Sequence, residues 1–143
     1  MKRLSFFLIL FVLCLFVSCH QFEVKDSSLK GIAEWQSQSK LLYVNPETGE
    51  SQVHSKYGIS FSEQSMNFTE YEIDETSEYP FKKKLGKVYL IKQINNSTLE
   101  VFSLDKESLG RIEYSFRVED GKIWLDVGGS FNLIESSFYR YQK

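Results

Sequence analysis

The sequence predicts an all-β fold, on the evidence of its composition, its alternating patterns and its turns. Aromatic residues make up 15% of the 143-residue chain, with 12 Phe and 8 Tyr, and aromatic side chains are enriched in strands. Only two prolines are present. Short apolar stretches with a period of two recur between turn sequences rich in Asn, Asp and Gly. About eight such strands in one domain predict an antiparallel up-and-down barrel, with a β-sandwich as the alternative.

The chain begins with the pattern of an export signal. Basic Lys2 and Arg3 precede an apolar run over residues 4–17, and small Ser18 stands before Cys19. The run is shorter than the roughly 20 apolar residues that a transmembrane helix needs. We therefore predict a signal peptide over residues 1–18 and a mature chain that starts at Cys19.

Cys19 is the most informative residue of this segment. No cysteine follows it, so a disulfide framework in the folded part is excluded. Phe16-Val17-Ser18-Cys19 resembles a bacterial lipobox at three positions of four, with Phe16 where the family usually has Leu. The resemblance implies that Cys19 carries a thioether-linked diacylglycerol and an amide-linked acyl chain of the palmitate type, which together anchor the domain in a membrane. Ordinary signal cleavage, with Cys19 left as a free thiol, is the alternative.

The residue after Cys19 bears on which membrane holds the anchor. In enterobacteria-like lipoproteins an Asp at this place retains the protein in the inner membrane, and this chain has His20 there instead. The resemblance therefore implies a bacterial cell envelope location in the outer membrane. Residues 19–28 read as the lipidated N-terminus and a short polar tether, and residues 29–143 as the globular domain.

The first half of that domain contains several expected strands. Residues 31–35 fit either a strand or a short helix. Residues 40–44 form a strand that enters an Asn-Pro-Glu-Thr-Gly turn at 45–49 and returns over 51–57. Residues 58–62 and 66–73 form the next expected pair.

The clearest local pattern is a hairpin in the second half. Residues 111–118 alternate with a period of two, Asp120-Gly121 supplies a two-residue turn, and residues 122–127 return. This turn places Arg117 opposite Trp124, where a cation–π contact can form on the outer face. The same register places four apolar side chains together on the core face: Phe116, Val118, Ile123 and Leu125.

The remaining strands flank this hairpin. Residues 87–91 and 98–104 are expected strands, with a polar connection at 105–110. Gly128-Gly129 marks a turn, and residues 130–141 are expected to form the last strand, with Phe131 and Leu133 on one face.

The order of these features resembles the small lipocalin-like lipoproteins of bacteria over about residues 29–142. It consists of a lipobox, a short tether, a first strand with Gly31 and Trp35, a series of hairpins and an aromatic C-terminal segment with Arg140. Lipocalins carry Gly-x-Trp in the first strand, whereas three residues separate Gly31 from Trp35 here. The resemblance implies a barrel in which Arg140 packs over Trp35.

The sequence provides little for catalysis or for metal and cofactor binding. Only His20 and His54 are present, no nucleophile elbow or glycine-rich phosphate loop occurs, and His54 is interpreted as a strand residue at the surface. Acidic residues at alternate positions over 70–74 match no calcium loop and are interpreted as a solvated surface facing the lysines at 82–87. We predict no catalytic residue, metal or cofactor, and the net charge of −2 gives no basis for nucleic-acid binding.

Two functional hypotheses remain, and neither is enzymatic. The first is a module that binds a small apolar or amphipathic ligand in an interior lined by aromatic residues, for which the candidates are Tyr89, Phe102, Tyr114 and Phe116. The second is a lipoprotein that binds or inhibits an envelope protein or an exogenous protein. An exposed aromatic patch with Trp124, Tyr139 and Tyr141, and Arg117 beside Trp124, favours the second hypothesis.

Overall fold

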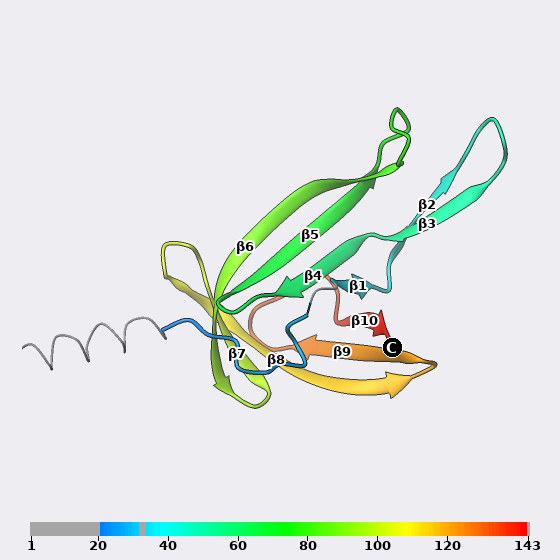
Figure 1. Ribbon diagram of the computed structural model, residues 1–143. Coiled ribbons are helices and arrows are strands. Elements are labelled where there is room, and N and C mark those ends of the chain that lie inside the picture. Colours follow the sequence, from blue (N-terminus) through cyan, green and yellow to red (C-terminus); the bar gives the residue numbers. More distant parts are fainter. Residues whose placement is uncertain (1–20, 32–33, 143) are drawn as a thin grey trace, which may run out of the picture.

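The computed structural model describes residues 21–31 and 34–142, so the predicted signal peptide and Cys19 lie outside the described residues. The described chain is all-β (Figure 1). Its strands are β1 (Trp35–Ser37), β2 (Lys40–Val44), β3 (Ser51–Ser55), β4 (Tyr57–Phe61), β5 (Ser65–Ile73), β6 (Phe81–Asn95), β7 (Thr98–Phe102), β8 (Ser108–Glu119), β9 (Lys122–Gly128) and β10 (Ser137–Tyr141).

Eight of these strands close into a barrel in the order β1-β10-β9-β8-β7-β6-β5-β4, with every neighbouring pair antiparallel. From β4 to β10 each strand pairs with the next one in the chain, which confirms the predicted up-and-down topology. A hairpin of β2 and β3 is inserted between β1 and β4 and forms a separate two-stranded sheet. Figure 1 shows this hairpin projecting from the barrel beside the tips of β5 and β6.

The barrel interior is filled by side chains that alternate along the strands. Trp35 on β1 and Ile59 on β4 are both buried and lie opposite each other in the β1–β4 pair. Leu99 on β7 and Ile112 on β8 form an equivalent buried pair. The N-terminal segment adds Val24 and Leu29, both nearly fully buried. Burial of such apolar side chains is the dominant favourable term in folding. The buried core cluster is Val24, Leu29, Trp35, Tyr57, Ile59, Phe61, Met66, Ile91, Leu99, Val101, Ile112, Tyr114, Leu125 and Phe138.

The predicted hairpin of β8 and β9 is confirmed in its turn and register. Asp120 and Gly121 have φ values of 54° and 70°, as a type I′ turn requires, and Arg117 lies opposite Trp124. The predicted core face is only partly right, because Leu125 is buried whereas Phe116 and Val118 are 36% and 65% exposed. Thr98, the first residue of β7, pairs with Glu113 of β8, so the later residues of β8 have no β7 residue beside them. The end of this hairpin therefore extends beyond the filled part of the barrel.

Strand β6 is much longer than the predicted strand at 87–91, because its first half pairs with β5 in an arm beyond the barrel. This half is rich in lysine and exposed on most positions, so it carries no apolar alternation. Cross-strand ion pairs connect Lys82 with Glu72 at 3.6 Å and Lys84 with Glu70 at 3.4 Å. These ion pairs confirm the interpretation of the acidic residues and the lysines as a solvated surface on which opposite charges attract each other.

The predicted last strand is wrong over its first half. Only Ser137–Tyr141 forms β10, and residues 129–136 form a loop that packs Phe131 and Leu133 against the core. The loop lies close against β8, where the Phe131 amide donates to the Arg111 carbonyl at 3.0 Å and Ser130 Oγ accepts from the Arg111 amide at 2.9 Å. These bonds replace the strand pairing that the aromatic alternation suggested.

Gly129 makes this close approach possible, and Gly129→Ala is expected to destabilise the domain by about 1–3 kcal/mol. The residue has φ +104°, and an added Cβ would lie 2.4 Å from the Arg111 carbonyl oxygen. Urea unfolding of the variant measures the loss. Gly86→Ala is the matched control, because a Cβ there meets no atom within 4 Å. Equal stability of the two variants would contradict the expected strain at residue 129.

Candidate functional site

One end of the barrel is closed by the N-terminal segment and a cluster around Trp35. The Trp35 indole Nε1 donates to the Leu29 carbonyl at 3.1 Å, and the Trp35 ring stacks on Phe116 with 5.8 Å between centroids. The Arg140 guanidinium lies 4.4 Å from the centre of the Trp35 ring and donates to the Ser28 carbonyl at 3.3 Å. The contact between Arg140 and Trp35 that the lipocalin resemblance implies is therefore present.

The described part of the predicted tether is bound along the barrel. The backbone N–H of Val24 donates to the Glu63 carbonyl at 2.7 Å, and the backbone N–H of Gln93 donates to the Glu23 carbonyl at 2.9 Å. Gln93 Oε1 accepts from the amides of Lys25 and Asp26, each at 3.1 Å. These bonds hold the chain against β6 and the β4–β5 turn from residue 23 onward.

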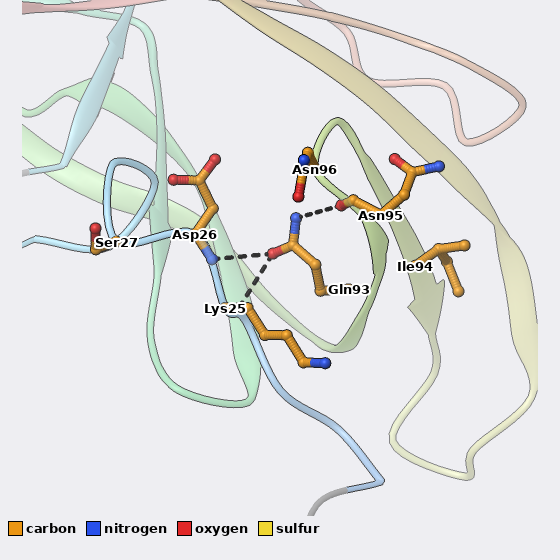
Figure 2. Close-up of a pocket in the computed structure, with 7 residues that line it drawn as sticks. All are labelled: Lys25, Asp26, Ser27, Gln93, Ile94, Asn95 and Asn96. Atoms are coloured by element: carbon orange, nitrogen blue, oxygen red, sulfur yellow. Dashed lines mark hydrogen bonds between the residues drawn. The ribbon is translucent and has the colours of Figure 1, made fainter.

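A polar pocket of about 530 Å³ lies between this segment and the β6–β7 turn (Figure 2). In Figure 2 the Gln93 side chain reaches from β6 to the backbone of residues 25 and 26, and its amide nitrogen donates to the Asn95 carbonyl. The lining is mostly polar, so the pocket does not match the predicted apolar ligand. It consists of Lys25, Asp26, Ser27, Gln93, Ile94, Asn95 and Asn96.

Tyr114 connects the buried core to the N-terminal segment through its hydroxyl group. Its hydroxyl donates to Asp26 Oδ2 at 2.8 Å and accepts from Gln93 Nε2 at 2.8 Å. Burial raises the pKa of Tyr114 most, the bond from Gln93 opposes that rise, and the bond to the Asp26 carboxylate adds to it, which gives a pKa of about 12.

This shift predicts a loss of stability in alkali that depends on Tyr114. The folded-state pKa of about 12 exceeds the ordinary value of 10.0, so the contribution of the neutral hydroxyl is fully present below pH 10.0 and is lost as the pH rises towards about 12. Urea midpoints across this range are expected to fall more steeply for the wild type than for Tyr114→Phe. Parallel curves would contradict the assignment.

Of the four residues predicted to line a ligand site, the structure brings only Tyr114 and Phe116 into ring contact. Tyr114 is buried in the core, with its ring 5.7 Å from that of Phe116. The Tyr89 ring packs on that of Phe131 in the 129–136 loop, with 5.2 Å between ring centroids. The Phe102 ring packs on that of Phe22, also with 5.2 Å between centroids. None of the four lines the 530 Å³ pocket or a second pocket of about 200 Å³ next to Phe131 and Leu133.

The predicted contact between Arg117 and Trp124 is confirmed, with the guanidinium 4.6 Å from the indole ring. Arg117 Nε also donates to Asp126 Oδ2 at 2.8 Å. Burial raises the pKa of Asp126, but the hydrogen bonds from Ser137 and Arg117 outweigh it and hold that pKa below the usual range. On the same outer face Lys122 lies 4.6 Å from the ring of Tyr139, which is itself 5.2 Å from Trp124. The predicted aromatic patch is thus covered by cations, and of its three rings Tyr141 is 65% exposed whereas Tyr139 is buried.

Sequence reasoning missed the surface of the β2–β3 hairpin. Leu42 lies directly opposite Val53, and these side chains are 59% and 60% exposed. Val44, two residues from Leu42 on the same face, is 52% exposed. On the other face of the hairpin, His54 packs against β5 and β6: its ring centroid lies 4.5 Å from that of Tyr71 and 5.2 Å from that of Phe81. The alternation of residues 40–44 contained this signal, but it did not show which face the barrel would cover.

No protein family, no curated protein and no solved structure matches this chain.

Over residues 21–31 and 34–142 no helix is long and apolar enough to cross a membrane. Within the same part of the chain no three His, Cys, Asp or Glu side chains gather as they would around a metal ion.

Proposed function

We propose that this protein is a lipid-anchored lipoprotein of the bacterial cell envelope that acts, without catalysis, as a binding module for a partner protein. The signal pattern of residues 1–18 and the lipobox at Cys19 support the anchor. The apolar face of the β2–β3 hairpin carries the proposal for the partner.

This face consists of Leu42, Val44 and Val53, on a hairpin that stands outside the barrel. A contiguous apolar surface held away from the core is typical of a protein interaction site. Among the described strands β2 pairs only with β3, so each has one edge with unpaired backbone groups. Such an edge accepts an extended segment of a partner, with apolar side chains contacting the face.

Site-specific photocrosslinking in the native host tests the proposal. A photoreactive residue replaces Val53 in the full chain, and one adduct of defined mass is expected. Leu42→Asp in the same chain is expected to remove the adduct, because a carboxylate opposite position 53 does not desolvate favourably. A matched crosslinker at Ile134, which is 69% exposed on the 129–136 loop, is the control. Equal crosslinking at both positions, or an adduct that survives Leu42→Asp, argues against the hairpin.

A small apolar ligand is the second candidate, supported by the contact between Tyr89 and Phe131. The loop at 129–136 holds Phe131 beside the 200 Å³ pocket, which Val127 and Leu133 also line. A fatty-acid probe whose fluorescence responds to its environment is expected to bind the wild type more strongly than Phe131→Asp, if this pocket enlarges around a ligand. Equal and unsaturable signals for both proteins would remove this candidate.

A further inference from the structure

We infer that the β7–β8 loop and the start of β8 rest on the membrane surface and place Leu104 and Leu109 among the lipid headgroups. The inference rests on the proposed anchor at Cys19 and adds the orientation in which that anchor holds the barrel. Three observations carry it: the short reach from Cys19 to the barrel, the place where that chain meets the barrel, and the exposed leucines there.

The reach follows from where the N-terminal segment becomes bound. Phe22 packs on Phe102, the last residue of β7, with ring centroids 5.2 Å apart. Three peptide steps join Cys19 to Phe22, and at no more than about 3.6 Å each they span about 11 Å at most. Acyl chains on Cys19 enter the bilayer and bring its backbone to the headgroups. The end of β7 is therefore held beside the membrane.

The loop that follows Phe102 and the start of β8 have the side chains for a shallow contact. Leu104 in the loop is 65% exposed, and Leu109, the second residue of β8, is 42% exposed. The loop is already folded, because the Ser103 amide donates to the Glu107 carbonyl and the Lys106 amide to the Ser103 carbonyl, both at 2.9 Å. A preformed loop loses little conformational freedom on contact. Asp105 and Glu107 outweigh the single cation Lys106, so attraction to anionic lipid does not drive the contact, and we do not expect high salt to weaken it.

The orientation also fits the place of the β2–β3 hairpin. In Figure 1 the N-terminal segment leaves the barrel on the left, whereas the tips of β2–β3 and of β8–β9 lie on the right. A barrel held at the β7–β8 loop therefore presents its apolar hairpin away from the lipid.

Depth-dependent quenching tests this orientation on the full lipidated chain. Cys14 is removed with the signal and Cys19 is acylated, so an introduced cysteine is the single free thiol of the mature protein. Leu104→Cys carries a fluorophore in vesicles of phosphatidylethanolamine and phosphatidylglycerol that contain a headgroup-level quencher. Val118→Cys is the matched control, because Val118 is also 65% exposed but lies at the β8–β9 tip.

We expect about a twofold loss of fluorescence at position 104, unchanged in high salt, and none at position 118. Intact mass of the same samples reports the acyl chains. Acylated protein with no quenching at 104, or with equal quenching at both positions, overturns the orientation alone. Protein that lacks the acyl mass overturns the anchor and the orientation together.

Discussion

Trp35→Ala is expected to lower the free energy of unfolding by about 3–5 kcal/mol, enough to unfold much of the protein. Trp35 is fully buried, and its ring lies between Phe116 and the Arg140 guanidinium. The substitution leaves a cavity where β1 closes the barrel and removes the donor that satisfies the Leu29 carbonyl. Urea unfolding followed by circular dichroism measures the loss.

Trp124→Ala is the matched control for this prediction. Trp124 is a second tryptophan on the outer face of β9, half-buried under Arg117, and its indole Nε1 has no hydrogen-bond partner within the described structure. Its removal is expected to cost less than about 2 kcal/mol. Equal losses for the two variants would show that Trp35 does not close the barrel as described.

Cys19→Ser is expected to move the protein from the membrane fraction to the soluble fraction. The hydroxyl of serine does not accept the thioether-linked diacylglycerol, so the variant lacks the acyl chains that stable attachment needs. Fractionation of envelopes from the native host and immunoblotting measure the change. Cys14→Ser lies within the predicted signal and is expected to leave the distribution unchanged. A Cys19→Ser protein that stays membrane-bound after signal removal would show that another feature holds it there.

The sequence predicted best those features that a few neighbouring residues determine. Asp120-Gly121 sets the register of β8 and β9, because a two-residue turn leaves one way for the flanking residues to pair. The turn predicted at 45–49 identified β2 and β3 as a hairpin, but residues 45–50 connect the strands, and the turn did not show that Lys40 pairs with Ser55. Of these two hairpins, only that of β8 and β9 carries its register in its turn.

The missed features depend on contacts that are distant in the sequence. Phe102 alternates as a core residue would, but Phe22 covers it, and nothing in β7 identifies that partner. Residues 130–136 look like a strand, yet Gly110 and Gly129 allow this segment to cross over β8 as a loop. Alternation separates two faces without showing which one the barrel buries. For this reason the alternation of residues 40–44 did not show that Leu42 would be exposed.

The intact mass of the mature protein, purified from its own envelope, tests the proposed lipid anchor most directly. In this proposal the anchor sets both where the domain works and which way its β2–β3 hairpin faces. The proposed anchor predicts a chain that begins at Cys19 and carries the mass of a diacylglycerol and one further acyl chain. A chain that begins at another residue, or one that begins at Cys19 with a free thiol, would contradict it.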